Sequence, residues 1–246
     1  MTIGNEKLTA LKTDSWRLFD AISRRYDLLN RILSLGLDKV WRREIIKYIP
    51  DKPGQMVLDV ATGTADVLIE LLETNAPIRI AYGIDMSEHM LKIGRTKIEQ
   101  RGLSSRAMLQ KGDAMALNFL DKTFELTTIA FGIRNLPLLI KGLTEMYRVL
   151  KPEGRVLILE FSIPQNPILR LGHFLYLHWI VPCIGFIFTG NYRAYHYLNQ
   201  TIESFPYGDR FCKIITQVGF KNVKAHPIMG GIATIYQGDK ALTSTY

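Results

Sequence analysis

Glycine and aspartate stand together at three places along the chain, in an order typical of a nucleoside-binding site. The segments are Asp59-Val60-Ala61-Thr62-Gly63-Thr64, Gly83-Ile84-Asp85 and Gly112-Asp113-Ala114. A glycine in a tight turn lets the backbone approach a ligand closely. A carboxylate about 20 residues beyond such a turn is placed to accept hydrogen bonds from ribose hydroxyls. We therefore expect Gly63 and Asp85 to bind a ligand that contains a nucleoside.

The chemical class of that ligand follows from what the first turn lacks. A pyrophosphate cradle requires the pattern G-x-G-x-x-G, but Gly63 is the only glycine between Asp59 and Asp66. The sequence also has no G-x-x-x-x-G-K-[ST] phosphate loop. This disfavours a nicotinamide oxidoreductase and favours S-adenosylmethionine, whose positive sulfonium is attracted to nearby acids. An aspartate at a strand end often only caps a turn, so the prediction rests on the three segments together.

The elements around these segments alternate between short apolar runs and amphipathic stretches. Strands are predicted over 56–61, 78–85, 106–110, 124–131 and 155–161, and helices over 65–74, 87–101 and 136–150. The turn residues 151–154 are expected to separate the last helix from the last of these strands. A helix over 208–218 and strands over 221–227 and 232–237 follow. The pattern predicts an α/β, Rossmann-like fold with a mostly parallel twisted sheet, helices on both faces and a ligand at the carboxyl ends of the strands.

Two regions lie outside this alternation. Residues 15–49 carry apolar side chains at helical spacing, which predicts an N-terminal helical lid within 1–50. Residues 165–198 form an apolar, aromatic-rich insertion before the last strands. Its length approaches that of a membrane span, but polar side chains interrupt it and Pro182 is expected to break the helix. We expect a substrate-side lid within a single domain, 1–246.

The composition of the 246-residue chain, 47% hydrophobic with a formal net charge of +8, suits one basic α/β domain. Such a charge is compatible with nucleic acid, an anionic membrane or an acidic substrate. The absence of a basic run or zinc-finger spacing disfavours nucleic acid. Cys183 and Cys212 lack metal-ligand spacing, so no metal is expected. Free thiols and the absence of an apolar signal core favour a cytoplasmic protein.

The glycine and aspartate segments together resemble the class I methyltransferases, and other segments narrow the resemblance. Those segments are Phe19–Asn30, Phe131-Gly132-Ile133-Arg134-Asn135, Glu145–Gly154, Leu159-Glu160-Phe161-Ser162, Ala194–Leu198 and Phe205-Pro206. They are similar to the ubiquinone/menaquinone biosynthesis C-methyltransferase family, over nearly the whole chain from about Phe19 to Lys240. The resemblance implies S-adenosylmethionine-dependent C-methylation of a prenylated hydroquinone ring, with demethylmenaquinol favoured over the ubiquinone precursor.

The resemblance also implies which residues contact the cofactor: Thr64, Asp85, Asp113 and Ala114. One position departs from the family pattern, because Ala130 stands where the family commonly has a serine. The absent hydroxyl removes a hydrogen bond worth about 1 kcal/mol, which weakens cofactor binding without abolishing it.

The reaction requires an electron-rich ring carbon, which a hydroquinone provides when a phenol loses its proton. Arg134, permanently charged, is the candidate that stabilises the phenolate; its alternative role is to anchor its loop by bonding backbone carbonyls. Tyr26 is the second catalytic candidate, closing over the cofactor or joining a proton path, unless it only packs in the core. Tyr195 and Tyr197 are candidates for the ring pocket. His196 is a candidate general base, a role that water could also fill.

The expected partners follow from the apolar prenyl chain of the implied hydroquinone substrate. A prenyl tail lives in the bilayer, so a peripheral enzyme is expected at the inner face of the membrane, helped by its basic charge. An exposed apolar lid could also pair with a copy of itself. Two other functions remain open: methylation of another lipid or small aromatic compound, and a non-catalytic methyltransferase-like module that binds lipid. Ala130 favours the module, whereas Gly63, Asp85, Asp113 and Arg134 argue for an enzyme.

Overall fold

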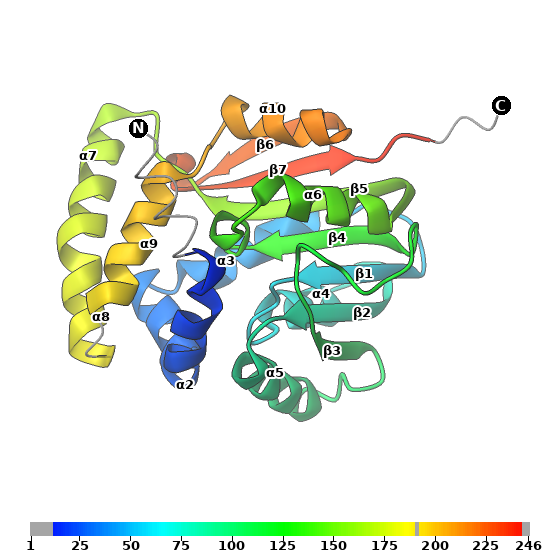
Figure 1. The fold of residues 1–246 in the computed structure, drawn as a ribbon, viewed down its shortest axis with the longest axis horizontal. Coiled ribbons are helices and arrows are strands. Elements are labelled where there is room, and N and C mark those ends of the chain that lie inside the picture. Colours follow the sequence, from blue (N-terminus) through cyan, green and yellow to red (C-terminus); the bar gives the residue numbers. More distant parts are fainter. Residues whose placement is uncertain (1–11, 190–191, 243–246) are drawn as a thin grey trace.

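A seven-stranded sheet in the order β3-β2-β1-β4-β5-β7-β6 forms the centre of the molecule (Figure 1). The computed structural model describes residues 12–189 and 192–242, without the side chains of residues 24, 186–189 and 192–196. The strands are β1 (Gln55–Val60), β2 (Ile78–Asp85), β3 (Ala107–Lys111), β4 (Phe124–Ala130), β5 (Leu150–Phe161), β6 (Lys221–Ile228) and β7 (Ala233–Asp239). Strands β1 to β5 are parallel, and β7 pairs antiparallel with both β5 and β6. The mostly parallel sheet predicted from the sequence is confirmed.

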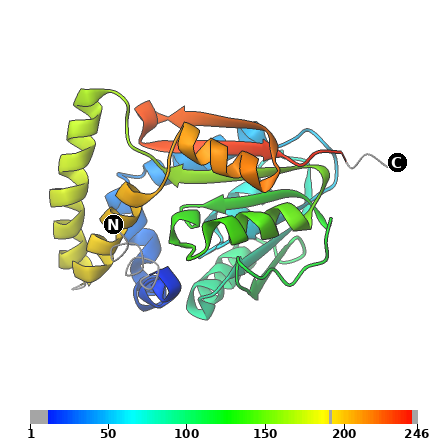
Figure 2. The ribbon, with the colours of Figure 1, turned by 45° about the horizontal axis from the view of Figure 1, so that its top comes forward.

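Helices cover both faces of this sheet (Figures 1 and 2). They are α2 (Ser15–Leu33), α3 (Leu37–Glu44), α4 (Asp66–Glu73), α5 (Glu88–Gln100), α6 (Leu139–Val149), α7 (Pro167–Leu175), α8 (Val181–Thr189), α9 (Tyr192–Ser204) and α10 (Asp209–Val218), with short turns η1 (Ile45–Tyr48), η2 (Ile133–Asn135), η3 (Tyr176–Ile180) and η4 (Met229–Gly231). Leu143 of α6 and Phe211 of α10 belong to one buried core, and Leu68 of α4 and Ile98 of α5 to another. Each face of the sheet therefore has its own apolar layer, as expected for a doubly covered parallel sheet.

The parallel strands β1 to β5 point toward one end of the molecule, where α2 and α7 to α9 gather (Figure 1). β1 is buried along nearly its whole length, because a central parallel strand packs against helices on both faces. Two of its residues are polar and buried: Gln55 at its start, and Asp59 at the end nearest the gathered helices. The topology thus brings the loops after β1, β2 and β4 to one edge of the sheet, beside the N-terminal helix.

The predicted turn at residues 151–154 is wrong. β5 begins at Leu150, which pairs with Phe124, and its register shifts before Leu126 pairs with Arg155. Glu153 has a φ of +60°, so the strand bulges rather than ends here. The backbone N–H of Glu153 donates to the carbonyl of Lys240 at 2.9 Å, and this pairing keeps the segment in the sheet.

The predicted break at Pro182 is also wrong, because α7, η3 and α8 follow one another without interruption from residue 167 to residue 189. η3 is a π-helical turn, and such a widened turn relieves the clash between a proline ring and the carbonyl of the preceding turn. The helix Pro167–Gly185 is long and apolar enough to cross a membrane by length and composition alone, with 22% of its most apolar window buried. Leu171 and Trp179 are 61% and 69% exposed.

Candidate active site

A cavity of about 240 Å3 lies at the carboxyl ends of the parallel strands, and we call it the smaller cavity. Four predicted cofactor-binding positions, Gly63, Asp85, Asp113 and Ala114, line it together. Another part of its wall comes from α2 and the residues just before it, including Trp16. Sequence segments 50 residues apart therefore meet at one cavity, with the N-terminal helix beside them.

Asp85, the last residue of β2, is held by the turn that follows β1. Its Oδ2 accepts a hydrogen bond from the backbone N–H of Gly63 at 2.9 Å, and its Oδ1 accepts one from the N–H of Ser87 at 2.8 Å. Gly63 has a φ of +56°, which glycine adopts at little steric cost. Burial raises the pKa of Asp85, although these backbone donors oppose the shift. Each carboxylate oxygen keeps a lone pair for a ligand hydroxyl.

Asp59, near the end of β1, also holds the turn after β1 in place, and its side chain is only 2% exposed. Its Oδ2 accepts a hydrogen bond from the Thr62 hydroxyl at 2.6 Å, and its Oδ1 accepts one from the Thr128 hydroxyl at 2.6 Å. Burial raises the pKa of Asp59 to about 6. The contacts tie the loop after β1 to the neighbouring strand β4, so the shape of the glycine turn depends on them.

The chemistry of the smaller cavity fits a phosphate-free nucleoside that carries positive charge. Lys12 is the only basic side chain in its described lining, whereas Asp85 and Asp113 offer carboxylates. Apolar side chains such as Met90 supply surface for a base. At Gly132 a Cβ atom would lie 2.8 Å from the Ala61 Cβ. Only glycine therefore lets the backbone at position 132 come this close to the turn after β1. These features match S-adenosylmethionine.

A larger cavity of about 430 Å3 adjoins the first and is lined mainly by apolar side chains of α2, α3, α7 and η3. Phe19, Tyr26 and Phe131 line both cavities, so these three residues stand where the cavities meet. Trp41 packs against Phe131 and Phe161, with ring centroids 5.9 Å apart in each pair. The arrangement offers a pocket for an apolar acceptor beside a pocket for the methyl donor.

Arg134, on η2, lines the larger cavity and is buried with an acidic partner. Its Nη1 donates to the Glu160 Oε1 at 2.6 Å and to the backbone carbonyl of Phe131 at 2.6 Å. The two side chains are 4% and 0% exposed. The guanidinium also stacks over the Phe161 ring at 5.3 Å. Its buried Nε has no hydrogen-bond partner among the described residues, so Arg134 both anchors its loop and keeps a donor unused.

The predicted tyrosines differ in how the structure presents them. Tyr26 lies at the junction of the cavities, and burial raises its pKa, so its hydroxyl stays protonated near neutral pH. Tyr197 lines the larger cavity, and its hydroxyl donates to the Oδ1 of Asn135 at 3.1 Å. Asn135 lines the smaller cavity. The side chains of Tyr195 and His196 lie outside the described part of the chain.

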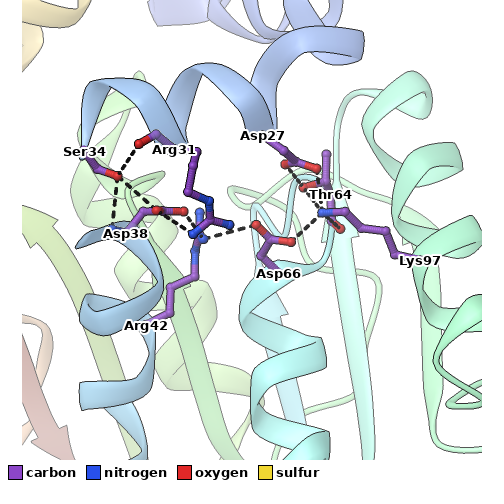
Figure 3. Close-up of polar contacts among 8 residues, drawn as sticks. All are labelled: Asp27, Arg31, Ser34, Asp38, Arg42, Thr64, Asp66 and Lys97. Atoms are coloured by element: carbon purple, nitrogen blue, oxygen red, sulfur yellow. Dashed lines mark hydrogen bonds and ion pairs between the residues drawn. The ribbon is translucent and has the colours of Figure 1, made fainter. Parts of the chain in front are cut away.

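Thr64 lines neither described cavity, unlike the four other predicted cofactor-binding positions. It is 2% exposed, and its hydroxyl donates to the Asp27 Oδ1 at 2.6 Å (Figure 3). The same hydroxyl accepts a hydrogen bond from the Lys97 Nζ at 3.0 Å. Its side chain therefore joins α2 to the glycine turn through a polar network.

Three further residues shape the site, and none of them was among the predicted site residues. Glu160 is the partner of Arg134, and the signal for it was an acid inside the apolar run of β5, because a buried charge needs an opposite one. Trp41 lines the larger cavity but showed only helical periodicity. Lys97 gave no signal, since an exposed face of a helix usually carries lysine. Among the described residues, no group of three or more metal-binding side chains comes together.

The fold and the paired cavities define a class I S-adenosylmethionine-dependent methyltransferase. Residues 8–240 match the model of the ubiE/COQ5 methyltransferase family, and the chain belongs to that family. It is 42% identical over 235 residues to a ubiquinone/menaquinone biosynthesis C-methyltransferase of Geotalea uraniireducens, covering 95% of this chain and 99% of the relative. It is 39% identical over 224 residues to a demethylmenaquinone methyltransferase of Bacteroides fragilis, covering 91% of each.

A solved structure supports the fold. A putative S-adenosylmethionine-dependent methyltransferase of Methanococcus maripaludis aligns with a TM-score of 0.64 at 17% identity, covering 91% of this chain and 94% of that chain. At that identity the likeness concerns the fold alone. The sequence prediction of a Rossmann-like class I methyltransferase is confirmed.

Proposed function

We propose that the protein transfers a methyl group from S-adenosylmethionine to a ring carbon of a prenylated hydroquinone, with demethylmenaquinol as the acceptor. The observation that carries this proposal is the junction of the two cavities at Phe19, Tyr26 and Phe131. A donor in the smaller cavity and an apolar ring in the larger one would meet there. The names of the family relatives, from two bacteria, agree with a quinone-biosynthesis acceptor.

The cofactor, when bound, supplies an activated methyl group, and this chain's residues position it. In the proposal, Asp85 accepts hydrogen bonds from the ribose hydroxyls. Asp113, Ala114 and the Gly63 backbone complete the walls around the nucleoside. Thr64 contributes indirectly, since its hydroxyl is engaged by Asp27.

Arg134 is proposed to act on the acceptor ring. Its Nε–H, which has no partner among the described residues, and its permanent charge suit a phenolic oxygen that becomes negative when water takes its proton. The ring carbon beside it then attacks the methyl group and afterwards loses its own proton to water, which restores the aromatic ring. Glu160 fixes the orientation of the guanidinium through Nη1. The Tyr26 hydroxyl, which burial keeps protonated, is proposed to hydrogen-bond at the junction. Tyr197 is proposed to fill the wall beside the ring, and Tyr195 to lie on the same substrate side.

The exposed apolar face of α7 and η3 is proposed to touch the cytoplasmic surface of a membrane. Its residues are Ile168, Leu171, Phe174, Leu175, Trp179 and Ile180, each at least 46% exposed. The same helix lines the larger cavity through Leu169 and His173. A prenyl chain that leaves the cavity along this helix would therefore stay in contact with lipid. The alternative is that this face contacts a second copy of the chain in a homodimer.

An acceptor panel tests the proposed function. The purified protein is incubated under reducing conditions with methyl-labelled S-adenosylmethionine and, separately, short-chain demethylmenaquinol, a short-chain ubiquinol precursor and a non-prenylated naphthohydroquinone. We expect labelled product by mass spectrometry with demethylmenaquinol first. If product formed only with the ubiquinol precursor, that compound and not demethylmenaquinol would be the acceptor. Cofactor binding with no product from any of them would favour the non-catalytic module.

A further inference from the structure

Three acids and three bases form an open series of five ion pairs that begins and ends on α2 (Figure 3). The series runs Asp27, Lys97, Asp66, Arg42, Asp38 and Arg31, and its first and last members lie one turn apart on α2. Between them it passes through α5, the first residue of α4, and α3. The charges alternate in sign along the series, so each of the four inner groups has an opposite charge on both sides.

Within this series, Lys97 contacts two acids and also Thr64. Its Nζ lies 2.7 Å from the Asp27 Oδ2 and pairs with the Asp66 Oδ1. It also donates to the Thr64 hydroxyl at 3.0 Å and to the Thr64 carbonyl at 3.3 Å. One ammonium therefore joins α5, α2 and the turn that carries Gly63.

The rest of the series reaches α2 again one turn further along, at Arg31. Arg42 bridges the Asp66 Oδ2 at 3.1 Å and the Asp38 Oδ2 at 2.7 Å. Arg31 of α2 then pairs with the Asp38 Oδ1 at 2.9 Å. Burial alone would raise the pKa of Asp66, but Arg42 and Lys97 outweigh it and the pKa lies below its ordinary value.

The position of α2 decides the shape of both cavities. Phe19 and Tyr26 of this helix line the smaller and the larger cavity alike. Asp27, the neighbour of Tyr26, and Lys97 line neither. Their bridge is thus outside the binding surfaces but one residue from the junction where donor and acceptor would meet.

We propose that Lys97 is a positioning residue, which clamps α2 against the glycine turn through Asp27 and so fixes Tyr26 over the bound methyl donor. The clamp couples the two cavities, because releasing Asp27 lets the same helix retreat from both. A separate tie near the start of α2, between Asp20 and the side chains of Ser87 and His89, stays in place. The release is therefore local to the second half of the helix.

Two variants open the clamp at different ends. Asp27→Asn removes the carboxylate charge that faces Lys97 and leaves the Lys97–Asp66 pair intact. Lys97→Met removes the ammonium group that both acids share and keeps a side chain of similar length. We expect each to weaken S-adenosylmethionine binding about five- to twentyfold by titration calorimetry. The double variant should be no weaker than the weaker single, because both cut the same bridge.

The matched control is Lys92→Met, an exposed lysine on the same helix that belongs to no ion pair of the described chain. It should bind the cofactor as the wild type does. Hydrogen exchange should quicken in residues 22–33 of Asp27→Asn and Lys97→Met but not of the control. In Asp27→Asn and Lys97→Met, the KM for the cofactor should rise by a larger factor than kcat falls. The wild type should also lose affinity between about 0.05 M and 0.5 M salt more steeply than either variant.

The clamp would be overturned if both variants bound the cofactor within twofold of the wild type while residues 22–33 exchanged at the wild-type rate. Additive losses in the double variant would equally contradict a shared bridge. Cofactor affinity is measured without any acceptor, so this result is separate from the fate of the hydroquinone proposal. Circular dichroism and thermal melting of each variant show whether a loss of affinity reflects a loss of fold.

Discussion

Arg134 and Glu160 form an ion pair of 2.6 Å in which both side chains are almost excluded from solvent. Removing one partner of a buried pair leaves an uncompensated charge, which costs about 3–5 kcal/mol. We expect Glu160→Gln and Arg134→Gln each to lower the free energy of unfolding by that amount in chemical denaturation. The double variant should lose less than the sum of the two. Additive losses would show that the two side chains do not depend on each other.

Asp85 should control the affinity for the cofactor. Asp85→Asn replaces a charged acceptor by a neutral amide, and hydrogen bonds to charged groups contribute about 1.5–3 kcal/mol. We expect S-adenosylmethionine to bind at least tenfold more weakly by calorimetry. Asp121→Asn, at a side chain that is 67% exposed and not part of the cavity lining, is the control. Equal affinity of Asp85→Asn and the wild type would remove Asp85 from the site.

Asp59 predicts a specific dependence of stability on pH. Its pKa is raised by burial to about 6 from an ordinary value of 3.8, so the folded state holds the proton more tightly than the unfolded chain. The stability from this group is present below pH 4 and is lost as the pH rises through 6. Asp59→Asn should therefore be more stable than the wild type at pH 8, by up to about 3 kcal/mol, and this advantage should vanish at pH 4. A pH-independent difference would contradict the raised pKa.

Ala130 offers a gain rather than a loss. It lines the smaller cavity at the end of β4, where the resemblance implies a serine. Ala130→Ser adds a hydroxyl, which should strengthen cofactor binding by about 1 kcal/mol, or about fivefold. Ala76→Ser, before β2 at the opposite end of the sheet, is the control. Weaker binding of Ala130→Ser would mean that the hydroxyl finds no partner on the cofactor.

The apolar face of α7 and η3 is tested with charge. Leu171→Glu and Trp179→Glu should each reduce binding to vesicles that contain anionic lipid, because they place a carboxylate where side chains 61% and 69% exposed would enter the interface. Turnover of a short-chain soluble quinol should be unchanged. Leu120→Glu, at an 83% exposed site elsewhere, should bind vesicles normally. Loss of self-association instead of vesicle binding would assign the face to a second copy.

Much of the fold followed from the sequence because the period of apolar residues changes cleanly between strands and helices. The sequence predicted the strands β1, β2 and β4 and the helices between them. It also predicted four positions that line the cavity, because each glycine–aspartate pair stands at the end of a strand: Gly63, Asp85, Asp113 and Ala114. The bulge at Glu153 was not, because a proline and a glycine in one segment usually signal a turn. The pairing with Lys240 that keeps it in the sheet is long-range.

The remainder of the site depends on tertiary packing that no local pattern records. Thr64 stands beside Gly63 in the sequence, yet its hydroxyl faces Asp27 rather than the cavity. Lys97 looks like any surface lysine until α2 comes against α5. The helix across Pro182 needed a π turn to continue, a feature with no sequence signature at that position.

The position of the transferred methyl group on the acceptor decides between C-methylation and the alternatives. The wild type is given S-adenosylmethionine with a carbon-13 methyl group and short-chain demethylmenaquinol, and the product is examined by nuclear magnetic resonance, with Arg134→Lys alongside. We expect the label on a ring carbon, and we expect Arg134→Lys to form this product many times more slowly while its cofactor affinity is unchanged. A label on a ring oxygen, or turnover by Arg134→Lys equal to that of the wild type, would contradict this expectation.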